Sequence, residues 1–148
     1  MTPTPEKEAV ISFENGVLSS EEVEAIFNTL PVEITFVDKD DIVQYFNQPK
    51  ERIFDRPKTA IGRTVQQCHS EKTIPAVNQI LEDLKTGKKD VVEFWTNSKD
   101  RLIHIRYFSV RNKNGENLGC LEVAQDITNI KKNEGEKRLL SGKRHLTE

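Results

Sequence analysis

Apolar and polar residues alternate along three consecutive segments in the second half of the chain. These segments are residues 90–96, 101–111 and 117–125. They are rich in the β-branched and aromatic side chains that suit a half-buried pleated strand. Between the last two segments, Asn114 and Gly115 can adopt the positive φ that a tight hairpin turn requires. The pattern therefore predicts three strands, of which the last two form an antiparallel hairpin.

A helix and a second hairpin are predicted in the first half of the chain. Apolar residues recur with helical spacing over residues 19–30, and Ser19 with Glu22 fits a capping box at the start. Pro31 prevents the helix from continuing. The next two strand-like runs are residues 32–37 and 42–46. Because only a short acidic turn separates these runs, they are expected to pair as a hairpin.

The segment between the two hairpins combines irregular and helical patterns. Residues 47–65 lose their periodicity, and prolines with Gly62 indicate short helical turns that could form a pocket wall. A longer amphipathic helix follows, capped by Ser70 or Thr73 and ending at Gly87. Together the elements predict an α+β domain with a five-stranded antiparallel sheet and helices on one face.

Composition and charge narrow the functional classes. The 148 residues suffice for one hydrophobic core, and a net charge of −2 with interleaved signs argues against binding to nucleic acid or anionic membranes. The sequence has neither a run of 18 apolar residues nor the start of a signal peptide. Cys68 and Cys120 lie far apart without a C-x-x-C motif. We expect a cytoplasmic protein with reduced thiols.

The chain is expected to contain one folded unit between two polar ends. Residues 1–18 are predicted to be a flexible N-terminal segment, and residues 19–128 to be the domain. Residues 129–148 are predicted to be a charged helix or linker tail, which Asp126 and Thr128 would cap.

Four short motifs occur in an order that is characteristic of one domain family. They are Asp38–Asp41 in the first hairpin turn, Ile61-Gly62-Arg63 before the long helix, Val110–Glu116 in the second hairpin and Asp126-Ile127-Thr128 at the end. With these motifs, residues 21–128 resemble a PAS domain, the small sensory fold of signalling proteins. Cys68-His69, Glu93-Phe94-Trp95 and Leu121-Glu122-Val123 further resemble a bacterial PAS subgroup found with hemerythrin-like or uncharacterised regions.

The resemblance implies a ligand or cofactor between the sheet and the helices, and a signal that leaves through the segment after residue 128. It does not identify the cofactor. A cupped sheet facing loosely packed short helices is physically suited to hold a small guest. The candidate lining residues are Phe36, Tyr45, Phe54, Val65, His69, Val77, Ile80, Phe94, Ile105, Tyr107, Cys120 and Glu122.

The orientation of Glu122 is left open by its strand. Alternation puts Cys120 and Glu122 on one face, but the pattern does not decide which face is inward. If Glu122 points inward it needs a partner, because an unpaired buried carboxylate is costly. The candidate partners are Arg63, His69, Tyr107 and a ligand amine. In the preceding strand, Ile103, Ile105 and Tyr107 form the better candidate core face.

Candidate catalytic and redox motifs are weak. Cys68 and His69 are adjacent, so their side chains diverge by about 100° on a helix and are badly placed for nucleophilic catalysis. We expect no enzymatic activity. His69 could bind metal or haem, since neutral imidazole is a good ligand. Yet haem-binding PAS proteins usually take their ligand from further inside the helix, where this chain has Ile74 to Val77. The cysteine run of flavin-binding relatives is missing.

Three hypotheses follow. The first is a sensory module that binds a small molecule between sheet and helices and forms a homodimer. The second is a ligand-free interaction module that dimerises through the predicted helix 19–30 and an exposed sheet face. The third is a metal- or haem-dependent redox sensor that uses His69, with Cys68 or Glu122 as a possible further ligand.

Overall fold

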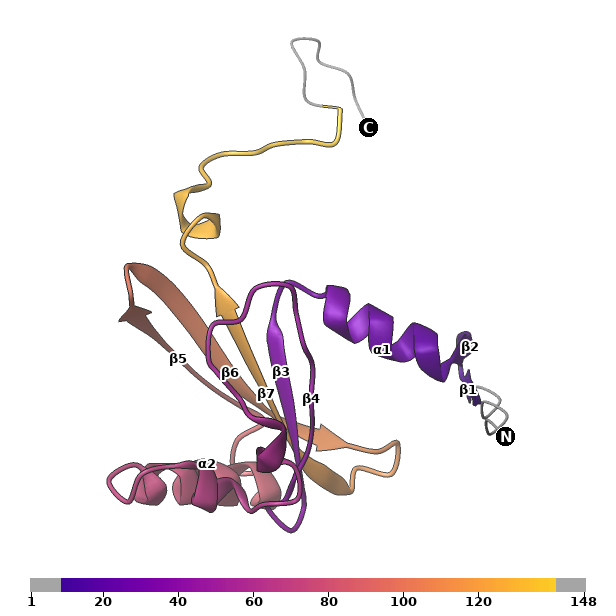
Figure 1. The fold of residues 1–148 in the computed structure, drawn as a ribbon, viewed down its shortest axis with the longest axis vertical. Coiled ribbons are helices and arrows are strands. Elements are labelled where there is room, and N and C mark those ends of the chain that lie inside the picture. The colour runs from indigo at the N-terminus through magenta and orange to yellow at the C-terminus, as the bar shows by residue number, and fades with distance from the viewer. Residues whose placement is uncertain (1–8, 141–148) are drawn as a thin grey trace, which may run out of the picture.

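Five antiparallel strands form the central sheet, in the order β4-β3-β7-β6-β5 (Figure 1). The computed structural model describes residues 9–140. The strands are β3 (Glu33–Asp38), β4 (Val43–Phe46), β5 (Val91–Ser98), β6 (Arg101–Arg111) and β7 (Asn117–Asp126). Each of the predicted strands is present, and the predicted five-stranded antiparallel α+β fold is confirmed.

The turn between β6 and β7 is organised by an asparagine side chain. Asn112 Oδ1 accepts hydrogen bonds from the backbone N–H groups of Asn114 and Glu116 at 2.9 and 3.0 Å. Gly115 has the expected positive φ of 81°, whereas Asn114 does not. The hairpin prediction is confirmed, but a single residue with positive φ suffices because the Asn112 side chain replaces a second backbone turn.

Helices cover one face of the sheet. The long helix α2 (Ile74–Thr86) packs across this face, together with the short 3-10 helices η1 (Lys58–Ala60) and η2 (Val65–Cys68). Pro75 lies in the first turn of α2, where its missing N–H costs nothing, and Gly87 ends the helix with a φ of 81°. On the sheet, Ile103 is fully buried and Ile105 is 6% exposed, as predicted for that face.

The N-terminal elements project from the sheet instead of covering it. Strands β1 (Val10–Phe13) and β2 (Gly16–Ser19) form a small hairpin, and helix α1 (Ser20–Thr29) follows directly. We call these three elements the N-terminal arm. The capping box between Ser19 and Glu22 is present, as predicted, but no residue of α1 is buried. In Figure 1 the arm extends sideways from the start of β3.

The N-terminal end differs from the prediction where it is described. The hairpin of the arm occupies residues 10–19, so this part of the predicted flexible segment is ordered. After β7, Thr128 donates both its N–H and its hydroxyl to Asp126 Oδ1, and only the short 3-10 helix η3 (Ile130–Lys132) follows. Of the predicted helix or linker, the structure has no α-helix between residues 129 and 140. Residues 1–8 and 141–148 lie outside the described residues.

None of the helices that the structure describes is long and apolar enough to cross a membrane.

Candidate functional site

A small cavity lies between the sheet and helix α2. Its volume is about 40 Å³. Its walls come from β3, β4, β6, β7, η2, α2 and the irregular segment before η1. The lining residues are Thr35, Val37, Val43, Arg56, Val65, His69, Val77, Ile80, Leu81, Tyr107, Cys120 and Glu122. Apolar side chains dominate, and the charged groups are Arg56 and Glu122.

The structure brings together seven of the twelve predicted lining residues. These are Val65, His69, Val77, Ile80, Tyr107, Cys120 and Glu122. On the sheet side they share one face because β6 and β7 pair Tyr107 directly with Glu122. The helix side contributes Val77 and Ile80, which are one turn apart on α2 and so face the same way.

Phe36 and Tyr45 do not line this cavity, because they belong to the opposite face of the sheet. They pair with each other across β3 and β4, while the neighbouring residues of β3 point to the cavity. The Phe36 ring lies against Gly119, and the Tyr45 ring contacts the Phe27 ring of α1 with centroids 5.8 Å apart. Sequence periodicity identified both as apolar strand residues but not their face.

The remaining three predicted residues lie beside the cavity. Phe54 and Ile105 belong to a neighbouring core cluster with Ile103 and Ala124. Phe94 is 41% exposed near the edge of the sheet, where its ring stacks on Tyr107 with centroids 6.1 Å apart. These side chains support the cavity wall without forming it.

An ion pair forms the polar end of the cavity. Glu122 points inward, and Arg56 Nη2 donates to its Oε1 at 3.1 Å. Of the partners that the sequence suggested for an inward Glu122, Tyr107 is hydrogen-bonded to it, whereas the arginine is Arg56 and not Arg63. The aperiodic segment 47–65 contains three arginines, and the sequence alone does not indicate which of them reaches Glu122. Among the described residues, the buried Arg56 Nε has no hydrogen-bond partner.

Two further polar groups at this end are held in their neutral forms. Burial, the charge of Glu122 and a hydrogen bond to it together raise the pKa of the Tyr107 hydroxyl. Burial and the nearby carboxylates, Glu122 before Asp41, raise the pKa of the Cys120 thiol to about 12. At neutral pH the cavity therefore presents a phenol and a thiol beside one ion pair, and Cys120 behaves as a small apolar residue.

His69 lines the cavity next to η2. Its Nδ1 lies 2.9 Å from the Val65 carbonyl oxygen, and because a carbonyl only accepts, Nδ1 carries the proton. Cys68, the neighbouring residue, is half-buried and does not line the cavity. Within the described part of the chain, no group of three or more His, Cys, Asp or Glu side chains is arranged to hold a metal ion.

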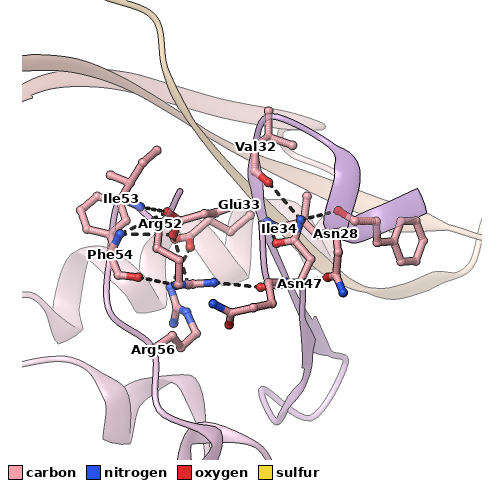
Figure 2. A network of polar contacts seen from close by, with 12 residues as sticks. Asn28, Val32, Glu33, Ile34, Asn47, Arg52, Ile53, Phe54 and Arg56 are labelled. Carbon is pink, nitrogen blue, oxygen red and sulfur yellow. Dashed lines mark hydrogen bonds and ion pairs between the residues drawn. The ribbon is translucent and has the colours of Figure 1, made fainter. Parts of the chain in front are cut away.

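A second polar network holds the segment that carries Arg56, and Figure 2 shows it. We call residues 47–73, between β4 and α2, the connecting segment. Buried Glu33 of β3 accepts hydrogen bonds from the backbone N–H groups of Ile53 and Phe54, the latter at 3.2 Å. It also pairs with Arg52 Nη2 at 3.2 Å. This carboxylate therefore fixes the connecting segment to the sheet two residues before Arg56.

Asn47 ties the start of the connecting segment to the arm. Its side chain is 1% exposed, and its Oδ1 accepts from the Ile34 N–H at 2.8 Å. Its Nδ2 donates to the carbonyl oxygens of Phe27 and Val32 at 2.8 and 3.0 Å. The end of α1, strand β3 and the connecting segment are thus joined through one buried amide (Figure 2).

A five-stranded antiparallel sheet with one long helix and short helical turns on one face, enclosing a small cavity, defines the class of small α+β sensory domains. The comparison with known families agrees. A family model described as a PAS domain matches residues 23–128. The chain belongs to the PAS domain family, whose members are generally sensory, non-catalytic modules. No curated protein matches the chain.

Solved structures support the same assignment. The C-terminal domain of a protein from Streptococcus mutans is similar to the chain, with a TM-score of 0.80 and 37% identity over 84% of this chain and 97% of that one. A PAS domain from Colwellia psychrerythraea gives a TM-score of 0.53 and 19% identity over 74% and 97%. A sensory box sensor histidine kinase from Vibrio cholerae gives 0.51 and 11% over 72% and 89%. The last two support the fold alone.

Proposed function

We propose that this PAS domain is a cytoplasmic, non-catalytic sensor that takes a small uncharged molecule into the cavity between sheet and helices and forms a homodimer. The observation that carries this proposal is the cavity itself, with an apolar wall and a polar end that leaves a buried Arg56 N–H without a partner. Such a donor favours a guest with a hydrogen-bond acceptor, or an ordered water in its place.

The charges of the lining favour an uncharged guest. Arg56 and Glu122 neutralise each other, so a charged ligand would be desolvated without a counter-charge unless it broke their pair. The size of the cavity restricts the guest further. A volume of about 40 Å³ holds a few water molecules, whereas drug-sized ligands need roughly 300 Å³ or more. A larger guest would require the connecting segment to move away from the sheet.

The residues fit less well to a haem or metal sensor. The hydrogen bond from His69 Nδ1 to the Val65 carbonyl would itself suit metal binding through Nε2, but the described residues supply no cluster of three metal-binding side chains around it. A porphyrin would also need far more room than the cavity offers. We therefore place no functional step on a metal or haem at this site.

A ligand-free interaction module is the second candidate. The observation that favours it is the arm, in which helix α1 has no buried residue and apolar side chains such as Phe13 and Ile26 remain 51% and 46% exposed. Apolar surface of this kind is typical of association sites. Two free cysteines in the described residues suit the reducing cytoplasm that both candidates assume.

Native mass spectrometry of the protein purified from its own host tests both candidates in one experiment. The sensor proposal expects a small adduct of defined mass on each protomer, and loss of that adduct in Val77→Phe, which fills the cavity. A matched exposed substitution, Val17→Phe, should keep the adduct. Dimers without any adduct would reject the sensor and favour the interaction module, and monomers without adduct would reject both.

A further inference from the structure

Two hollows of this domain meet at one side chain. The second hollow is a surface groove of about 480 Å³ between α1, β4 and the connecting segment. It is lined by Glu24, Asn28, Gln44, Tyr45, Phe46, Gln48, Arg56, Lys58 and Ile61. Among residues 9–140, Arg56 alone lines both this groove and the inner cavity. Its side chain therefore lies in the wall that separates the cavity from the groove.

The wall is held closed by a single hydrogen bond between charged groups. Arg56 Nη2 reaches Glu122 Oε1 of the central strand β7, and the two side chains are 18% and 20% exposed. The bond uses one nitrogen and one oxygen, so it lacks the second parallel hydrogen bond that locks a bidentate pair. Partial exposure weakens it further through solvent screening. Arg56 is therefore held less firmly than it would be in a fully buried, bidentate pair.

The backbone on both sides of Arg56 is anchored to the rest of the domain. The Arg56 side chain can therefore move without unfolding of the connecting segment. Phe54 packs in the core cluster beside Ile105, and its N–H is bonded to Glu33. On the other side, Ala60 is 5% exposed, and its N–H donates to the Pro57 carbonyl at 2.9 Å. Between these anchors the Arg56 side chain can rotate alone.

We propose that the Arg56–Glu122 pair is the gate through which small molecules pass from the surface groove into the cavity. When Arg56 swings toward the groove, the polar end of the cavity opens; when it returns, the guest is enclosed beside Glu122 and Tyr107. The gate depends on the proposed function in one respect, that the cavity receives a guest. Arg56 then selects which molecules enter.

Cys120 provides a built-in reporter, because its thiol lines the cavity and the residue is 6% exposed. Methyl methanethiosulfonate is small and uncharged. The Cys120 thiolate attacks its sulfenyl sulfur, a mixed disulfide forms, the thiol proton goes to solvent and methanesulfinate leaves. On a Cys68→Ser background, intact-protein mass spectrometry then measures how fast the reagent reaches the cavity.

The gate predicts that Arg56→Met raises the modification rate of Cys120 by about tenfold or more. This factor corresponds to the lower part of the free-energy range for losing a hydrogen bond between charged groups. Arg56→Met with Glu122→Gln should be at least as fast, because removing the Glu122 charge also favours the Cys120 thiolate. Lys58→Met, which alters the groove but not the shared wall, should react like the parent. The rate of Cys120 modification should also be measured at low urea concentrations. It should not rise with urea in the same proportion as the fraction of globally unfolded protein.

Three results would overturn the gate: equal rates in parent and Arg56→Met, acceleration by Lys58→Met, or a urea dependence equal to that of unfolding. If Arg56→Met does not fold, Glu122→Gln replaces it, because this substitution keeps the shape of the side chain and weakens the pair. A Cys120 modification rate in Glu122→Gln that is unchanged from the parent would then reject the gate. These measurements of the Cys120 modification rate do not require a natural ligand. A protein without any native adduct but with a fast Arg56→Met variant would reject the sensor function and keep the gate.

Discussion

At the scale of single residues, two carboxylates, one buried and one half-buried, determine where the connecting segment lies. Glu33 and Glu122 both point to the helical side of the sheet, and each is matched by an arginine of that segment. Because an uncompensated charge becomes more costly as it is buried, each pair favours positions of the segment that the arginine can reach. Glu33 has the stronger role, since two backbone N–H groups also bind it.

Glu33→Gln should therefore lower the free energy of unfolding by about 3 kcal/mol, in the range for breaking a buried ion pair. The amide keeps the size of the side chain but leaves Arg52 without its counter-charge. Urea denaturation followed by tryptophan fluorescence measures the change. Glu51→Gln, at an exposed position of the same segment, is the control and should stay within about 0.5 kcal/mol of the parent. Equal stability of the two variants would contradict the role given to Glu33.

At the scale of elements, one glycine sets the distance between β3 and β7. Gly119 has a φ of +151°, and a Cβ at this position would lie 2.2 Å from the Val37 carbonyl oxygen and 2.9 Å from the Phe36 ring. Both neighbours belong to the strand that β7 pairs with, so the clash cannot be relieved by a flexible side chain alone. The glycine thereby allows Cys120 and Glu122 to be brought over the cavity.

Gly119→Ala should destabilise the domain by about 3 kcal/mol, the upper part of the range for overpacking. Gly16→Ala is a close control, because Gly16 has a nearly equal φ of +147° but no atom within 4 Å of the added Cβ. The difference between the two variants in thermal or urea unfolding isolates the clash from the backbone strain. Similar losses in both variants would show that strain, not contact with β3, explains the glycine.

At the scale of the whole molecule, the N-terminal arm is the part that does not pack into the hydrophobic core. Strands β1 and β2 and helix α1 lie beside the sheet, and their apolar side chains gain little burial within one copy. The arm is held at its base by hydrogen bonds through Asn47 and Asn28 and by the contact of the Phe27 and Tyr45 rings. An exposed ion pair joins Glu14 of its hairpin turn to Lys113. A second copy of the chain could cover this surface, which is why the proposed function includes a homodimer.

Ile26→Glu should shift the protein toward the monomer by about tenfold or more in dissociation constant, since it places a charge on the apolar face of α1. Sedimentation velocity over a concentration series measures the shift. Ala25→Glu adds the same charge one residue earlier, on a different face of the helix, and should leave association unchanged. A wild-type protein that is monomeric at all concentrations, or equal effects of both variants, would remove α1 from the interface.

The sequence by itself determined the elements of this protein and their order. Period-two alternation, the Ser19 capping box, the Asn-Gly turn and Gly87 are local signals, because each depends on residues close together in the chain. The order of the elements then pointed to the antiparallel sheet, and the short motifs to the family. Seven cavity residues followed from the same patterns.

Only the tertiary structure decided the faces and the partners. The two faces of β7 carry similar apolar content, so the inward position of Glu122 depends on packing against α2 and on Arg56, 66 residues away. Phe36 and Tyr45 were assigned to the cavity because their strands are apolar, and register across β3 and β4 puts them on the other face. The irregular segment has no period at all, so its contacts with Glu33 and Glu122 arise only when distant residues meet.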